Sequence, residues 1–265
     1  TRRSQIRQPR TLTRARTVRR FSDADLEFWA ANGYVVLHDA VPQENLQAVI
    51  DDVWQFLDMD PTDQNTWYRD ASALVPEGER PPHSPGGMVE LYQSQSLWDN
   101  RQHPRVHAAF AQIWGTKKLW CSMDRANMKP PVRESEPEWQ HPGMVHWDAD
   151  TTSGKGSFRV QGVLYLADTP ANGGGFQCLP GFHRQFESFH ASLGPDVDRD
   201  RQSLMQHLPG EPRTIPGKAG DLLIWHSFLP CVHCGSHLWI VVALTARVSG
   251  ECAGTGTPST RATSP

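Results

Sequence analysis

The sequence predicts a mainly β protein, an antiparallel sandwich or jelly roll with helices packed on its outside. Apolar residues at helical spacing come early in the chain, and short apolar runs separated by Pro and Gly come later. The sequence has no Gly-rich strand-to-helix turn of the kind that opens a βαβ nucleotide-binding fold. At 265 residues and 38% hydrophobic composition, the chain is long enough to bury one sizeable core.

The two ends of the chain differ from the rest in composition. The first 20 residues carry eight arginines and no acid, so residues 1–21 are predicted to form a disordered basic arm. An Arg-rich, acid-free start is also typical of an organelle transit peptide, and this alternative stays open. Residues 250–265 are rich in Gly, Thr, Ser and Pro and predict a disordered tail, which leaves residues 22–249 as one domain.

The ordered part is expected to begin with helices. Ser22 with Asp25 three residues later predicts a capped helix that ends at Asn32-Gly33, followed by a short strand at 34–37. An amphipathic helix is predicted around residues 46–57, and another around 106–114. Between them, residues 60–87 lack periodicity and are predicted to form a loop.

The second half of the chain is expected to be strand-rich. Pro170, Asn172 and three consecutive glycines form a strong turn signal between two apolar runs. The predicted strands cover residues 119–123, 144–148, 160–166, 176–179, 220–226 and 238–244.

The charge and the cysteine content limit which functions and cellular locations are expected. A formal net charge of −3 and a pI near 6.4 argue against nucleic acid as a partner, so a small-molecule substrate is expected. Five scattered cysteines are unlike a secreted disulfide framework, and no apolar stretch approaches the length of a membrane span. We therefore expect a cytoplasmic protein without a membrane partner.

His146 and Asp148 are the strongest candidates for metal binding. Side chains alternate along a strand, so these two project to the same face while Trp147 projects to the other. One imidazole and one carboxylate suit a borderline divalent metal, and a third ligand from a distant strand would complete the facial triad of non-haem iron(II) oxygenases.

Four motifs in this order resemble the phytanoyl-CoA dioxygenase family of iron(II)- and 2-oxoglutarate-dependent oxygenases. They are NGYVV at 32–36, HWD at 146–148, LPGFH at 179–183 and GDLLIWH at 220–226. The resemblance implies a cupin-like double-stranded β-helix over residues 22–249, which binds iron(II), decarboxylates 2-oxoglutarate to succinate with O2 and hydroxylates a small organic substrate. It makes His146 and Asp148 iron ligands, and it makes Gln161 a contact to the oxoacid or the substrate. The LPGFH turn is interpreted as structural.

The resemblance is lost after Pro230. Family members continue with Leu-Pro-His-Gly, and that His binds iron, whereas here Leu229-Pro230 is followed by Cys231. We predict that His233 supplies the third ligand, with His226 and Cys231 as alternatives. The family also places an Arg about eleven residues after its His to pair with 2-oxoglutarate, and position 242 here is Val, so Arg247 is the predicted substitute.

Three functions follow from these residues. The first is an active Fe(II)- and 2-oxoglutarate-dependent dioxygenase. The second is a catalytically impaired family member that binds metal or ligand without turnover, favoured by the changed residue at position 231. The third is a cupin-like metalloenzyme that does not use 2-oxoglutarate, which would explain the missing Arg but not the earlier motifs.

Overall fold

The computed structural model describes residues 21–69, 81–123, 125–139, 145–152, 159–235 and 239–248, without the side chains of residues 174, 201–202, 233–235 and 239–248. The predicted tail at 250–265 and all but the last residue of the predicted arm lie outside these ranges. The last residue of that arm, Phe21, is only 4% exposed. Its N–H donates to Gln112 Oε1 at 3.0 Å, and its carbonyl accepts from Gln112 Nε2 at 2.8 Å, so packing starts no later than Phe21.

Most of the helices come in the first half of the described chain, and most of the strands come later. The helices are α1 (Asp23–Asn32), α2 (Gln43–Leu57), α3 (Gln95–Arg101), α4 (Pro104–Trp114), α5 (Phe186–Ser192) and α6 (Arg201–Met205), with 3-10 turns η1 (Gln64–Thr66), η3 (Pro137–Trp139) and η4 (Phe182–Arg184). The strands are β1 (Tyr34–Leu37), β2 (Met88–Val89), β3 (Leu119–Cys121), β4 (Ala126–Lys129), β5 (Val160–Tyr165), β6 (Gly174–Cys178), β7 (Arg213–Thr214), β8 (Leu222–His226), β9 (Cys231–Gly235) and β10 (Trp239–Val248). None of the helices in the described ranges combines the length and apolar character needed to cross a bilayer.

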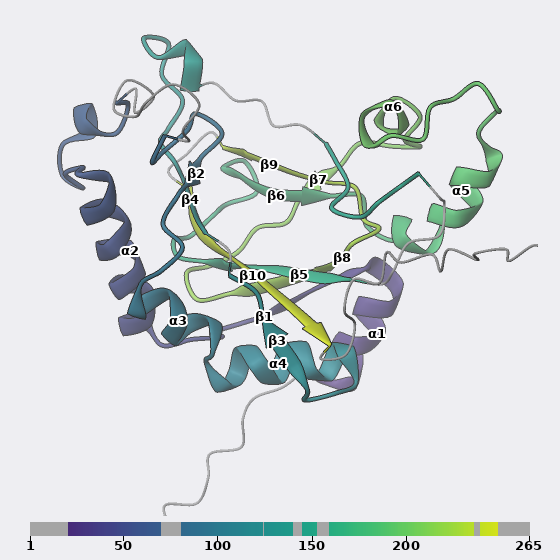
Figure 1. Ribbon diagram of the computed structural model, residues 1–265, viewed down its shortest axis with the longest axis horizontal. Helices are drawn as coiled ribbons and strands as arrows, with labels where there is room; N and C mark the ends of the chain where they lie inside the picture. Colours follow the sequence, from purple (N-terminus) through teal and green to yellow (C-terminus); the bar gives the residue numbers. More distant parts are fainter. Residues whose placement is uncertain are drawn as a thin grey trace, which may run out of the picture.

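The strands form two antiparallel sheets that face each other. The larger sheet has the order β1-β8-β5-β10-β4-β2, with β3 also paired to β10, and the smaller has the order β7-β6-β9. Figure 1 shows α1, α3 and α4 on the side of the larger sheet that faces away from the smaller sheet. The architecture is therefore the predicted jelly roll with helices on its outside.

Alternation along the strands divides the core in two. In β8, Leu222 and Ile224 pack with the helices, while Leu223 and Trp225 pack against the smaller sheet. The first cluster lies between the larger sheet and the helices, and the second lies between the two sheets. A residue on the inner face of the larger sheet therefore faces β6 and β9 across the space between the sheets.

Three of the recognised motifs meet at the end of α1. The amide of Gly181 donates to the Asn32 carbonyl at 2.8 Å, and the amide of His226 donates to the Gly33 carbonyl at 2.8 Å. Gly33 has φ +76°, and a Cβ there would lie 2.4 Å from the His183 ring. Since only glycine tolerates both conditions, this junction explains the NG pair and supports the structural interpretation of the LPGFH turn.

Two local predictions are wrong. The strand expected at 144–148 is reduced, within the described residues, to one isolated bridge between His146 and Cys231, because the chain bends at Asp148. The expectation that helices end before the strand-rich half also fails, since α5 and α6 lie between β6 and β7. These helices are short, and their periodic signal is correspondingly weak.

Candidate metal centre

His146 and Cys231 are joined by their backbones. The N–H of His146 donates to the Cys231 carbonyl at 2.9 Å, and the N–H of Cys231 donates to the His146 carbonyl at 2.9 Å. Cys231 begins β9, whose register with β6 places it opposite Cys178. This reciprocal pair fixes the relative position of two residues that lie far apart in the sequence.

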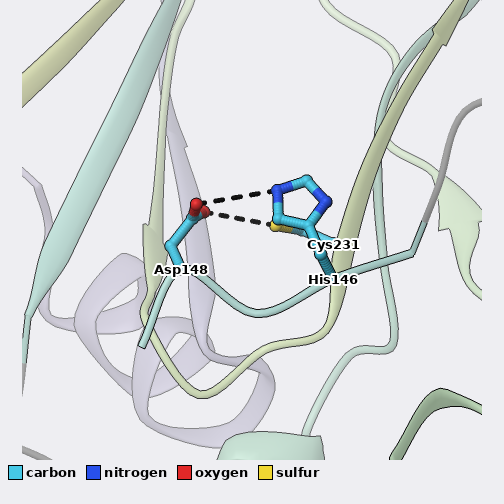
Figure 2. A group of neighbouring side chains, drawn as sticks. All are labelled: His146, Asp148 and Cys231. Atoms are coloured by element: carbon cyan, nitrogen blue, oxygen red, sulfur yellow. Dashed lines mark hydrogen bonds and ion pairs between the residues drawn. The ribbon is translucent and has the colours of Figure 1, made fainter. Parts of the chain in front are cut away.

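Asp148 places a carboxylate beside the side chains of His146 and Cys231 (Figure 2). Its Oδ1 lies 3.6 Å from His146 Nε2, and its Oδ2 accepts from the Cys231 thiol at 3.5 Å. One potential ligand atom from each of the three side chains lies within 4.8 Å of the other two. The structure thus gathers one imidazole, one carboxylate and one thiol into a group able to hold a single metal ion.

The three side chains differ in their access to solvent. The side chains of His146 and Asp148 are 31% and 25% exposed, whereas Cys231 is completely buried. Burial, and then the negative charge of Asp148, raise the pKa of the Cys231 thiol well above its usual value. The group is therefore open on the His146 and Asp148 side and closed on the sulfur side.

The buried side chain of Trp147 holds the segment that carries His146 and Asp148 in place. Its side chain is fully buried, its indole N–H donates to the Phe228 carbonyl at 3.1 Å, and its ring packs against Phe182 and Phe186. Because Trp147 is fixed in the core, its neighbours His146 and Asp148 are held on the opposite side. The alternation expected from the HWD motif is retained although the segment has only one bridge.

Gln161 lies on the inner face of the larger sheet. It pairs with Trp225 of β8 and precedes Val163 and Tyr165, whose side chains belong to the cluster between the sheets. Its half-buried side chain therefore faces the same interior as Cys231, as the resemblance implies. Its contact with the oxoacid stays a prediction.

The remaining sequence candidates fall where the structure describes only the backbone. His233 lies in β9 opposite Phe176, and Arg247 lies in β10 opposite Trp120. Their side chains are outside the described part of the chain, so their roles stay predictions. Within the described side chains, the residue that joins His146 and Asp148 is Cys231, one of the two alternatives to His233.

β4 adds inward-facing residues that sequence reasoning missed. Ala126 and Met128 pack on the helix side of the larger sheet, so Asn127 and Lys129 face the interior. Lys129 is only 2% exposed, which places a lysine side chain in the space between the sheets. The alternation over residues 126–129 is the signal that would have revealed this strand.

The other alternative ligand, His226, belongs to an aromatic cluster. Its ring lies 5.1 Å from that of His183 and 5.2 Å from that of Phe228, and its Nδ1 accepts the Phe228 N–H at 3.1 Å. Burial, and then the neighbouring His183, lower the pKa of His226 from 6.5 to about 4. This ring is therefore neutral in the native protein at neutral pH.

The depressed pKa of His226 predicts acid sensitivity. The unfolded chain takes up a proton near pH 6.5 and the folded chain only near pH 4, so stability is full above pH 6.5 and falls between these values. Over that window, the loss for this group is up to about 3 kcal/mol. Urea unfolding from pH 7.5 to 4 should show a flatter profile for His226→Asn, whereas His207→Asn, at an exposed histidine, should follow the parent. An unchanged slope in His226→Asn would contradict the assignment.

Comparisons with known proteins support one family. The sequence model of phytanoyl-CoA dioxygenase matches residues 29–233. A Dictyostelium discoideum protein, provisionally named a phytanoyl-CoA dioxygenase, is 20% identical over 248 residues, covering 77% of this chain and 68% of that protein. The Aspergillus versicolor Ava biosynthesis cluster protein O is 28% identical over 176 residues, covering 63% of this chain and 53% of that protein.

Solved structures share the fold at low identity. The epimerase SnoN, in complex with Fe3+, alpha ketoglutarate and nogalamycin RO, has a TM-score of 0.58 and 15% identity, covering 89% of this chain and 91% of SnoN. EctD from S. alaskensis, with 2-oxoglutarate and 5-hydroxyectoine, has a TM-score of 0.56 and 16% identity, covering 86% of this chain and 76% of EctD. Because the family match spans most of the chain, the protein belongs to the phytanoyl-CoA dioxygenase family and is a 2-oxoglutarate-dependent oxygenase that uses iron(II) and O2.

Proposed function

We propose that this oxygenase hydroxylates a small organic substrate at a metal centre that contains His146 and Asp148. The observation that carries the proposal is the 3.6 Å approach of His146 Nε2 to Asp148 Oδ1, on side chains that remain partly open to solvent. Imidazole and carboxylate are ligands that suit iron(II), so these two residues fit the metal. Iron(II), when bound, supplies the redox chemistry that couples O2 to the decarboxylation of 2-oxoglutarate.

The overall reaction balances without a further reductant. One atom of O2 enters the hydroxyl group of the product, and the other enters the succinate formed as 2-oxoglutarate loses CO2. The substrate class is supported by the small organic molecules found with SnoN and EctD, nogalamycin RO and 5-hydroxyectoine. The three cysteines whose side chains are described, Cys121, Cys178 and Cys231, are free thiols, which supports a cytoplasmic location.

The interior polar residues support binding of the oxoacid. Lys129 and Gln161 lie on the inner face of the larger sheet, together with Asn127. A lysine ammonium in a site shielded from water pairs favourably with a carboxylate, and an amide can hydrogen-bond to it. Lys129 can thus supply positive charge in a chain that has Val242 where the family has Arg.

The test is succinate formation from 2-oxoglutarate by the purified chain with iron(II) and ascorbate under air, measured against the His146→Ala variant. Succinate that requires both O2 and His146 is the expected result. Absence of succinate from the parent chain, with turnover in Cys231→His, would favour the impaired family member. Oxygen consumption that ignores 2-oxoglutarate would refute the proposed reaction.

A further inference from the structure

Backbone hydrogen bonds on both sides fix the position of Cys231, the third residue of the metal group. Its backbone is bonded to His146 on one side, and its strand pairs with β6 on the other. Its side chain is completely buried in the cluster between the sheets, and its Sγ is directed at Asp148 Oδ2. The sulfur thus faces the carboxylate without any change of backbone.

The separations of the donor atoms fit one shared ion. Metal–nitrogen and metal–oxygen bonds of about 2.1 Å and metal–sulfur bonds of about 2.3 Å place neighbouring ligand atoms about 3 to 3.8 Å apart. In the group, Sγ lies 3.5 Å from Oδ2, Nε2 lies 3.6 Å from Oδ1, and one ligand atom from each residue lies within 4.8 Å of the other two. Ion binding therefore requires at most small side-chain rotations.

We propose that Cys231 is the third protein ligand of the metal, so that the centre consists of one imidazole, one carboxylate and one thiolate. The inference rests on the proposed metal site at His146 and Asp148. When the metal–sulfur bond forms, the S–H bond breaks and the proton passes to a buffer base, so no oxidant is needed. Two anionic ligands then balance the charge of a divalent ion, and the softer sulfur donor shifts the preference of the site towards thiophilic metals.

The proposal makes the residue at position 231 part of the metal's first coordination sphere, in place of the imidazole of other family members. His233 then lies one strand repeat further along β9 and is not required to reach the ion. Experiment can distinguish Cys231 from His233 as the third ligand, because the two assignments predict opposite effects for substitutions at positions 231 and 233.

Cobalt(II) reports thiolate ligation by absorption, independently of turnover. The whole chain, loaded with cobalt(II) without oxygen, is expected to show visible bands of the bound ion and a near-ultraviolet band of thiolate-to-cobalt charge transfer. Cys231→Ser should lose the charge-transfer band and bind cobalt at least about 10- to 100-fold more weakly, since loss of a residue that only orients a ligand already costs that much. Cys178→Ser, at the buried cysteine opposite Cys231 in β6, should keep the band and the affinity. Cys231→Ala is the second variant should the buried serine disturb folding.

Each other outcome has a defined meaning. Cobalt binding that depends on His146 but gives no charge-transfer band would overturn the thiolate assignment and leave the proposed function intact. A band that persists in Cys231→Ser and Cys231→Ala would assign the sulfur to another cysteine and also overturn it. Loss of cobalt binding in His233→Ala, with normal binding in Cys231→Ser, would establish His233 as the ligand and refute the inference.

Discussion

Replacing His146 with alanine is expected to weaken iron(II) binding by about a hundredfold or more. Loss of residues that only orient a metal ligand already costs 10- to 100-fold in affinity, so loss of a ligand should cost at least as much. His146 Nε2 lies 3.6 Å from Asp148 Oδ1, and alanine offers no nitrogen at that position. Isothermal titration with iron(II) under nitrogen measures the affinity directly.

The matched control for this substitution is His207→Ala, at an exposed histidine that is not part of the metal group. It should leave both affinity and stoichiometry at the parent values. The His146 side chain is partly exposed, so its truncation should change thermal stability little when metal is absent. Parent-like iron affinity in His146→Ala would refute the metal centre itself.

Replacing Trp147 with alanine should cost about 3 to 5 kcal/mol of folding free energy, the usual cost of deleting a fully buried large aromatic side chain. Its side chain is 0% exposed and packs with Phe182 and Phe186, whose side chains also lie in the cluster between the sheets. The truncation additionally leaves the Phe228 carbonyl without the indole N–H. Denaturant unfolding of the metal-free chain measures the loss.

Trp147→Phe separates packing from hydrogen bonding. Phenylalanine keeps much of the aromatic volume but loses the indole N–H, so the expected loss is about 1 to 3 kcal/mol. A smaller change for Trp147→Ala than for Trp147→Phe would contradict the role of the buried ring. The comparison also shows whether the anchor affects the ligands, because a displaced segment should weaken iron binding even where the protein remains folded.

Local signals were the parts of the fold that the sequence predicted well. The Ser22–Asp25 capping box and the left-handed Gly33 define both ends of α1, and each depends only on neighbouring residues. The sequence predicts β8 with an error of two residues at its start. Its continuous apolar run is easy to recognise because both faces of the strand are buried, each in a different core cluster. The HWD motif, together with the family resemblance, pointed to two of the three residues that the structure brings together.

The parts that the sequence did not predict depend on contacts between distant residues. β9 contains the residues CVHCG, which have no clear strand pattern, and it exists through its pairing with β6. The spacing of His226, Cys231 and His233 alone could not choose between three ligand candidates. The bridge between His146 and Cys231 favours Cys231, and it becomes visible only once the two segments are brought together.

The position of β10 in the larger sheet affects the order in which the strands can pair during synthesis. β10 is the last described element of the chain, yet it lies inside the sheet and pairs with β5, β4 and β3. During synthesis, β5 and β4 emerge from the ribosome long before the strand that joins them, and both keep an unpaired edge until then. The nascent chain therefore passes through a stage in which its helices and β8 are available but its larger sheet is still divided.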